Sequence, residues 1–189
     1  ATILAGKWHL GINEPDRWPL QRGFEKFYGC IPGATNFFYP EAPRGLHLGN
    51  EAVTEFTSTT DRRFYTTDAF TDYAVDFIEA ERQGDGRPFF LYLSYTSPHW
   101  PLHAHEEEVA KYRGKYLMGW DELRAQRLQR QREIGLVDPN WELTERDGPA
   151  WDSLTPQKQR EMDLRMAYYA AMVDRMDQNI GRLLRNLEE

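Results

Sequence analysis

The chain has 189 residues, a length that suits one domain. Its net charge of −7 argues against a nucleic-acid binder, which needs a basic face, but it does not exclude an anionic small substrate, because such a site needs only local positive charge. Apolar residues make up 40% of the chain, enough for a core, yet no run approaches the roughly 18 apolar residues of a membrane span. The single cysteine, Cys30, excludes a disulfide framework and a cysteine-rich zinc site.

The first predicted element is a buried strand over residues 2–5, an apolar run bounded by glycine. The sequence GKWHLG follows at residues 6–11. Residues two apart on an extended backbone face the same side, so Lys7 and His9 are expected to converge on one point. A lysine charge beside a histidine that exchanges a proton near pH 7 suits an oxyanion site. The spacing alone equally fits a solvated lysine and a histidine packed beside Trp8.

Residues 13–44 are rich in proline, glycine and aromatic residues and show no sustained period, which predicts a long functional loop folded over a site. Residues 46–53 then predict a small hairpin around a Gly-Asn turn. Thr67 and Asp68 are expected to cap a helix, whose apolar positions follow a helical spacing. The Gly-Asp-Gly sequence at 84–86 is expected to end it.

Residues 89–95 are nearly continuously apolar and predict a central strand of a parallel sheet that is covered on both faces. A helix followed by such a strand indicates a layered α/β fold, in which ligands bind beyond the carboxyl ends of the strands. His99 and the pair Lys7 and His9 each follow a predicted strand. One end of one sheet is therefore expected to bring them together.

His99, His103 and His105 lie within seven residues, which raises the hypothesis of a zinc site. Pro101 prevents the helical geometry that would bring His99 and His103 together, and no nearby cysteine or aspartate completes a compact ligand set. We therefore do not favour zinc, and we name no metal ligand in this chain.

The second half of the chain is predicted to be helical. Residues 106–156 are interpreted as a surface helix and linker insertion, because the arginines of 121–133 are diluted by acidic residues and lack interleaved aromatics for base stacking. A last helix over 157–188 carries apolar residues three and four apart, which predicts a packing stripe. The members of this stripe are Met166, Tyr169, Val173, Met176, Ile180, Leu183 and Leu187.

GKWHLG resembles the second signature of the formylglycine-dependent sulfatases, in the alkaline-phosphatase-like superfamily. Three further blocks occur in the family's order: residues 22–29, residues 88–102 and residues 168–183. The resemblance implies an α/β fold, part of an α/β/α sandwich with a mostly parallel central sheet. It also implies that residues 1–189 are an internal segment of the catalytic domain, with the sheet incomplete and 13–44 forming an active-site loop region.

The resemblance implies roles for individual residues. Lys7 would bridge the nucleophile and a sulfate oxygen, His9 would act as general base, and His99 would contact the sulfate and protonate the leaving oxygen. The loop that begins at Asn36 and the segment around His103 are expected to face the substrate.

The nucleophile and the metal implied by the resemblance are expected outside this chain. A formylglycine would come from an upstream cysteine through a formylglycine-generating enzyme, and Ca²⁺ or Mg²⁺ would be held by an upstream Asp-Asp pair and a downstream Asp-Asn pair. Cys30 begins a segment similar to the family's Cys-x-Pro/Ala-x-Arg sequence, in which the cysteine becomes formylglycine. However, Ala34 stands in place of the arginine, and the segment follows GKWHLG instead of preceding it. Cys30 is thus rejected as the nucleophile and expected to be buried. The segment alone is predicted to be inactive.

The function expected for the full-length protein is release of inorganic sulfate from an aryl or sugar sulfate. Two alternatives stay open: a phosphodiesterase or phosphonate monoester hydrolase of the same superfamily, and a catalytically dead protein that binds sulfated glycans. An export signal would lie upstream. The family favours a periplasmic or exported location, and the compartment stays open.

Overall fold

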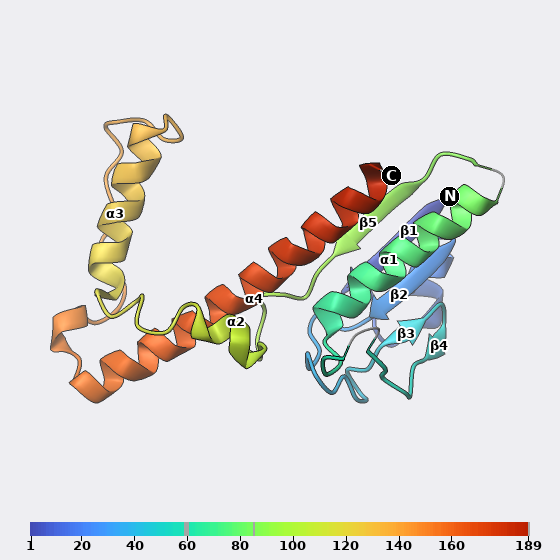
Figure 1. The fold of residues 1–189 in the computed structure, drawn as a ribbon, viewed down its shortest axis with the longest axis horizontal. Coiled ribbons are helices and arrows are strands. Elements are labelled where there is room, and N and C mark those ends of the chain that lie inside the picture. Colours follow the sequence, from blue (N-terminus) through green and yellow to red (C-terminus); the bar gives the residue numbers. More distant parts are fainter. Residues whose placement is uncertain (59–60, 85, 189) are drawn as a thin grey trace. The chain divides into compact units, whose positions relative to one another are not determined.

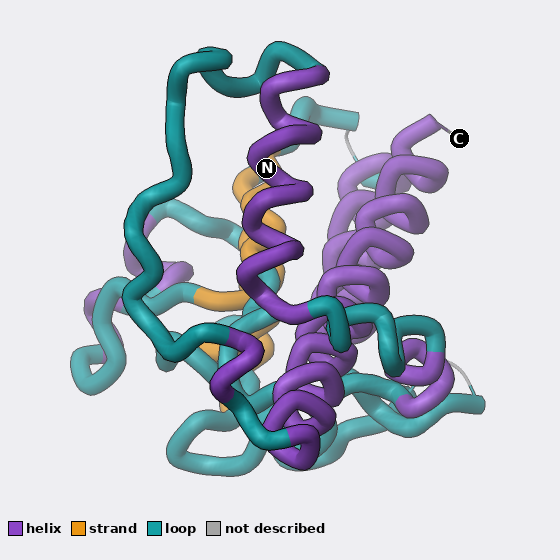
Figure 2. Tube along the Cα trace, turned by 90° about the vertical axis from the view of Figure 1, so that its left-hand side faces the viewer, coloured by secondary structure: helices purple, strands orange, loops and turns teal. Residues whose placement is uncertain are grey.

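The computed structural model describes residues 1–58, 61–84 and 86–188. They form two compact units, residues 1–104 with 172–189, and residues 105–171. Among the described residues, all five strands belong to the first unit. Figure 1 labels the elements, and Figure 2 separates strands, helices and loops by colour.

The sheet of the first unit is mostly parallel, as predicted. Its order is β4 (Glu51–Ala52), β3 (His47–Leu48), β2 (Lys26–Cys30), β1 (Thr2–Lys7) and β5 (Phe90–Ser94). β1 runs parallel to both β2 and β5, whereas β3 pairs antiparallel with β2 and with β4. The predicted first strand and the predicted hairpin are both confirmed.

One face of the sheet is covered by α1 (Thr66–Gln83) and by the carboxyl-terminal half of α4 (Pro156–Glu188), which lie over the strands in Figure 1. Ile3 of β1 packs in one buried cluster with Ile78 of α1 and Leu183 of α4. Burying three such side chains contributes several kcal/mol, roughly 1.5–3 for each. This cluster fixes both helices on the sheet.

The start of α1 differs from the prediction. Tyr65 is the N-cap, and Thr66 and Thr67 lie inside the helix as buried residues. Asp68 does not cap the helix, because its carboxylate accepts hydrogen bonds from α4 instead. The predicted end is confirmed at Gly84, whereas Asp85 lies outside the described residues.

Asp68 joins α1 to α4 through a charged, partly buried contact. Its two carboxylate oxygens accept hydrogen bonds from Arg175 at 2.7 Å each, and one of them also accepts from Asn179 at 2.7 Å. The Asp68 and Arg175 side chains are 17% and 15% exposed. Paired charges with this little solvent are costly to break, because the remaining partner stays desolvated.

We expect Asp68→Asn to lower the free energy of unfolding by about 2 kcal/mol. Urea denaturation of the full-length protein measures the change. The control is Glu161→Gln, which removes an exposed partner of Lys158 and Arg165 and is expected to leave the midpoint unchanged. Equal midpoints for Asp68→Asn and the wild type would contradict the structural role of this contact.

The opposite face of the sheet is covered by loops. Leu4 and Phe27 pack there against Trp8, Trp18 and Phe24. The prediction that residues 89–95 form a covered central strand is wrong for the described chain: β5 lies at the sheet edge, with Phe90 59% and Tyr92 46% exposed. An apolar run indicates a strand that packs against apolar neighbours, but it does not distinguish a central strand from an edge strand.

Residues 13–44 contain a strand that the sequence did not reveal. β2 lies within the predicted loop, and two short 3₁₀ helices, η1 (Pro15–Arg17) and η2 (Pro19–Arg22), precede it. Gly29 interrupts the apolar pattern of β2, and glycine weakens the usual signal of a strand. The glycine is required there, because a β-carbon on Gly29 would lie 1.8 Å from the carbonyl oxygen of Gly6.

The long last helix is confirmed as α4, but its predicted packing stripe is mostly wrong. Val173, Ile180 and Leu187 are exposed, whereas Asn179 and Leu183 are buried. The contacts of α4 with α1 include polar ones, from Arg175 and Arg182 to aspartates of α1, and a search for hydrophobic periodicity does not detect these.

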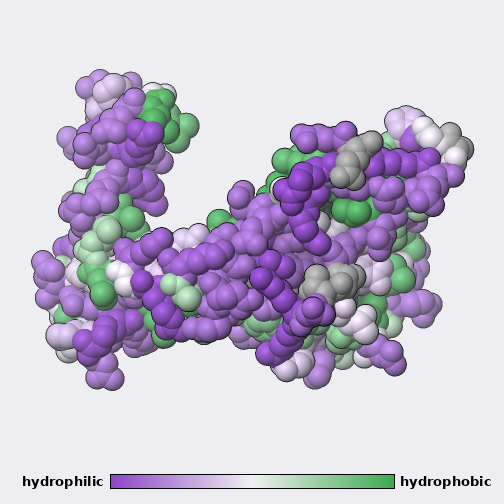
Figure 3. All heavy atoms as spheres, viewed as in Figure 1, coloured by the Kyte–Doolittle hydropathy of each residue, from purple (hydrophilic) through white to green (hydrophobic). Residues whose placement is uncertain are grey.

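The second unit holds α2 (Glu106–Ala110), α3 (Gly119–Glu133), η3 (Trp151–Ser153) and the first half of α4. α3 is almost entirely solvated, and Figure 3 shows hydrophobic residues gathered at one of its ends. Ile134, Leu136 and Trp141, which follow α3 in the chain, are exposed. Within the described residues, no helix combines the length and apolar character that a bilayer crossing requires.

Candidate functional site

His9 and His99 line the same hollow, of about 420 Å³. The hollow lies past the carboxyl ends of three adjacent parallel strands: His9 follows β1, Pro32 follows β2 and His99 follows β5. The structure thus brings the two histidines together as the sheet argument expected. The complete lining among described residues is His9, Ile12, Pro32, Gly33, Ala34, Pro43, Arg44 and His99.

His9 is held in an unusual backbone conformation. Its φ is +64°, in the left-handed region, and its backbone N–H donates to the carbonyl of Ile31 at 3.0 Å. A side chain larger than glycine seldom adopts this region unless the surrounding structure imposes it, and such residues cluster at functional sites. The surrounding fold therefore holds His9 in an energetically unfavourable backbone conformation, which fixes the position of its imidazole.

The extended backbone assumed in aligning Lys7 with His9 is not present at His9. β1 ends at Lys7, whose register partner is Cys30, and the chain then turns into the left-handed conformation at His9. The two-residue alternation of a strand does not extend past its end, so it cannot align the two side chains. Lys7 is not among the described residues that line the hollow.

The imidazole of His9 lies directly against the α-carbon of Gly33. A β-carbon placed on Gly33 would lie 2.4 Å from Cε1 of His9 and 2.6 Å from its Nε2. Gly33→Ala is therefore expected to push the imidazole aside and leave the backbone intact. Misplacing a reacting group by about an ångström is costly in rate.

We expect Gly33→Ala to lower kcat/KM of the full-length protein by about tenfold or more, with an unchanged melting temperature. Steady-state kinetics of the full-length protein and thermal unfolding measure the two effects. Gly148→Ala is the matched control, because a β-carbon there meets nothing within 4 Å. Wild-type kinetics for Gly33→Ala would show that the position of the His9 imidazole is irrelevant to activity.

His99 is oriented by a backbone carbonyl. Its Nδ1 lies 2.8 Å from the carbonyl oxygen of Trp100, and because a carbonyl only accepts, Nδ1 carries the proton of this bond. Nε2 is then the nitrogen that exchanges a proton with a ligand. The preceding segment is anchored, since the Ser97 hydroxyl donates to the carbonyl of Met172 at 3.0 Å and the His99 N–H donates to Thr96.

Asn36 and His103 lie away from the lining of this hollow. The Asn36 side-chain oxygen accepts hydrogen bonds from the backbone N–H groups of Phe38 and Tyr39, both at 3.0 Å, so it shapes the loop. His103 packs against the ring of Phe38, with the ring centroids 5.9 Å apart. Burial and the nearby charge of Arg63 lower the pKa of His103, so its imidazole is neutral at pH 7.

Cys30 is fully buried, as predicted. Its thiol donates to the carbonyl of Pro32 at 3.3 Å, and burial raises its pKa to about 12 although Lys7 acts in the opposite direction. A thiol that stays protonated is a poor nucleophile. This environment agrees with the rejection of Cys30 on its sequence context.

The described residues contain no cluster of three or more histidine, cysteine, aspartate or glutamate side chains arranged to hold a metal ion. This holds for the histidines at 99, 103 and 105 as for the rest of the described chain. Within the described ranges this leaves no carboxylate cluster for Ca²⁺ or Mg²⁺ either, and the chemical steps assigned below to this chain use its own side chains.

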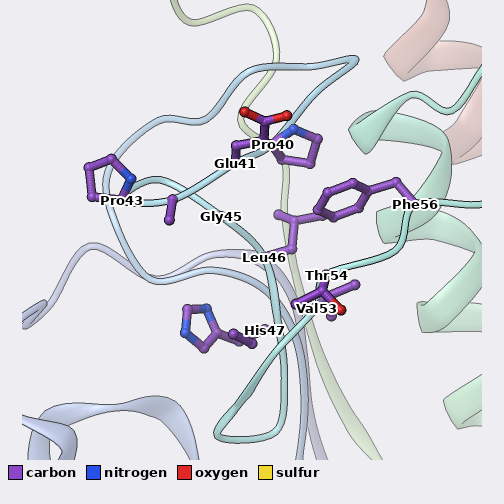
Figure 4. A pocket seen from close by; sticks show the side chains of 11 residues that line it. Pro40, Glu41, Pro43, Gly45, Leu46, His47, Val53, Thr54 and Phe56 are labelled. Carbon is purple, nitrogen blue, oxygen red and sulfur yellow. The ribbon is translucent and has the colours of Figure 1, made fainter.

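A second hollow, of about 450 Å³, lies along the same loop and shares Pro43 with the first. Figure 4 shows its mainly apolar side chains, with the carboxylate of Glu41 and the ring of His47. His47 packs edge-on against Trp18 at 5.3 Å, and burial lowers its pKa. Its Nδ1 lacks a hydrogen-bond partner within the part of the chain described.

Arg44 is the lining residue that sequence reasoning missed. It lies in the aperiodic region 13–44, where no spacing indicates which side chain faces a site. Its only sequence signal is a lone cation between a proline and a glycine, which is too common to be specific.

Known proteins are similar to this chain both in sequence and in fold. The family model described as Sulfatase matches residues 1–189, which is the whole chain. The chain belongs to the sulfatase family. The sulfatase chain is 36% identical to the "Uncharacterized sulfatase PB10D8.02c" of Schizosaccharomyces pombe, over 97% of the chain and 34% of that protein. It is 32% identical to an arylsulfatase of Klebsiella aerogenes, over 100% of the chain and 41% of that enzyme.

Two solved structures resemble the sulfatase chain in fold. Ps i-CgsB in complex with k-i-k-neocarrahexaose has a TM-score of 0.60 at 24% identity, covering 99% of the chain and 33% of that structure. BT4656 in complex with its substrate D-glucosamine-2-N,6-O-disulfate has a TM-score of 0.57 at 19% identity, covering 99% and 44%. These neighbours bear out an incomplete alkaline-phosphatase-like α/β fold. The chain spans less than half the length of each of these relatives.

Proposed function

We propose that the full-length protein containing this chain hydrolyses sulfate esters and releases inorganic sulfate. The observation that carries the proposal is the shared hollow of His9 and His99 beyond β1 and β5, in a chain whose whole length matches the sulfatase family. Two imidazoles on one concave surface supply a proton acceptor and a proton donor for an ester cleavage.

In the proposed reaction the two histidines have opposite tasks. His9 takes the proton from the attacking hydroxyl as that oxygen bonds to sulfur. As the bond from sulfur to the leaving oxygen breaks, Nε2 of His99 gives that oxygen a proton, and an alcohol or phenol departs. Lys7 ends β1 two residues before His9, outside the lining of the hollow, and is proposed to contribute longer-range positive charge to the site.

The attacking hydroxyl is proposed to belong to a formylglycine hydrate made from an upstream cysteine by a formylglycine-generating enzyme. Such a hydrate would supply the attacking hydroxyl and a second hydroxyl for the later release of sulfate. A Ca²⁺ or Mg²⁺ ion bound outside this chain is proposed to accompany it.

The substrate class is proposed to be a sulfated sugar or an aryl sulfate. The sugar alternative is supported by the two structural neighbours, one in complex with k-i-k-neocarrahexaose and one with a disulfated glucosamine. The aryl alternative is supported by the arylsulfatase of Klebsiella aerogenes.

The test is sulfate release by the full-length protein, co-expressed with a formylglycine-generating enzyme and supplied with calcium. Ion chromatography would follow 4-nitrophenyl sulfate and glucosamine 6-sulfate, with bis(4-nitrophenyl) phosphate and phenyl phosphonate esters as competitors. We expect sulfate from at least one ester, with a loss when His9 or His99 is replaced. Faster turnover of the phosphorus esters would favour the phosphodiesterase alternative, and binding without turnover would favour a glycan-binding protein.

A further inference from the structure

The hollow of His9 and His99 is also lined by a permanently charged side chain, Arg44. The loop that carries it is tied to the wall of the same hollow. The Thr35 hydroxyl donates to the Arg44 carbonyl, and Nη1 of Arg44 lies 3.5 Å from the carbonyl oxygen of Ala34, a lining residue. The Arg44 N–H donates to the carbonyl of Glu41 at 3.0 Å, which closes a turn just before the arginine.

The charge of Arg44 is not balanced inside the hollow. No carboxylate is found among the described lining residues, and no ion pair of Arg44 is formed with residues 1–58, 61–84 or 86–188. Other arginines of the first unit differ: Arg175 and Arg182 pair with aspartates of α1. Arg44 is exposed, and its guanidinium donates to the Ala34 carbonyl but is paired with no carboxylate of the described residues. A guanidinium has five N–H donors, so those that remain are suited to bind a planar or tetrahedral anion through paired hydrogen bonds.

The anion recruited by Arg44 need not be the sulfate that is cleaved. Under the proposed function that group is served by His9 and His99, which follow β1 and β5, whereas Arg44 belongs to the loop after β2. A hollow of about 420 Å³ has room for a ring as well as for one sulfuryl group. Arg44 is thus placed to contact the part of the substrate that leaves.

We propose that Arg44 is a specificity-determining residue that binds a second anionic group, a carboxylate or another sulfate, on the leaving portion of the sulfate ester. This inference rests on the proposed function. It narrows the substrate class to esters that carry at least two negative charges, because a neutral leaving group would leave the guanidinium without its partner.

The test compares esters that differ only in a second charge. The full-length protein and its Arg44→Gln and Arg44→Lys variants are assayed on 4-nitrophenyl sulfate and on its ring-carboxylated isomers. We expect the wild type to prefer one carboxylated isomer. Arg44→Gln should lower kcat/KM for that isomer by about tenfold to a hundredfold through KM, and change the parent ester by less than about twofold. Arg44→Lys should restore part of the loss.

Arg22→Gln is the matched control, because Arg22 is exposed and lies outside the hollow. An equal loss of kcat/KM for Arg44→Gln on the carboxylated and the parent ester would overturn the inference. Arg44 would then bind the cleaved sulfate or stabilise the folded structure. A wild type without preference for any carboxylated isomer would overturn it as well. Failure of the proposed function is recognised separately, since the wild type would then release sulfate from none of the esters.

Discussion

Replacing Gly6 by alanine is expected to lower the free energy of unfolding by about 3 kcal/mol or more. Gly6 lies near the end of β1, in register with Gly29 of β2 and Ser94 of β5. A β-carbon on Gly6 would lie 1.9 Å from the carbonyl oxygen of Ser94, well inside the contact distance of the two atoms. Its φ of +119° is also a conformation that L-residues avoid.

The clash at Gly6 is with backbone, so no side-chain rotation relieves it. The sheet has to separate between β1 and β5, and that separation also moves the segments that carry His9 and His99. Gly6→Ala is therefore expected to cost both stability and activity.

Gly23→Ala separates backbone strain from the clash. Gly23 has a φ of +99°, but a β-carbon there meets nothing within 4 Å. Strain alone predicts a loss of about 1 kcal/mol at this position. Urea denaturation of the full-length protein measures both variants. If Gly6→Ala were no more destabilising than Gly23→Ala, the close approach of β1 to β5 would be wrong.

Replacing His99 by glutamine is expected to lower kcat by about 10²- to 10⁴-fold on a sugar sulfate. The alkoxide that leaves a sugar sulfate is strongly basic, so its departure depends on a proton from Nε2 of His99. His99 is exposed, and its removal is not expected to change the melting temperature.

The leaving group distinguishes a proton donor from a simple binding residue. 4-Nitrophenolate is a stable anion and departs without a proton, so His99→Gln should reduce its release much less than that of a sugar alcohol. The measurement is kcat for both esters with wild type and variant. An equal fall on the two esters would rule out a proton-donating role and leave only a contribution to binding.

Elements with a sustained hydrophobic period or tight turn chemistry were predictable from the sequence: β1, the 46–53 hairpin, α1 and the length of α4. Elements whose residues are determined by tertiary contacts were not predictable from the sequence. β2 contains a glycine demanded by the close approach of Gly6, and α4 buries the polar side chain of Asn179 toward Asp68. A hydrophobic pattern is a property of one chain segment, whereas the residue type at these positions depends on contacts with a second segment.

The site was partly predictable for the same reason. His9 and His99 follow strands whose carboxyl ends meet at one sheet edge, and that rule of parallel sheets placed them together. Arg44 comes from a loop whose path follows no period, and the left-handed turn at His9 is invisible in residue spacing. The roles of Lys7, Asn36 and His103 stay predictions.

The hollow between His9 and His99 is proposed to receive the sulfuryl group, and the decisive experiment is a crystal structure of the full-length protein with inorganic sulfate, the product. We expect a sulfate ion in this hollow, with one oxygen about 2.7–3.0 Å from an imidazole nitrogen of His9 and another at that distance from Nε2 of His99. Sulfate bound elsewhere in the protein, with both imidazoles facing only solvent, would contradict this placement.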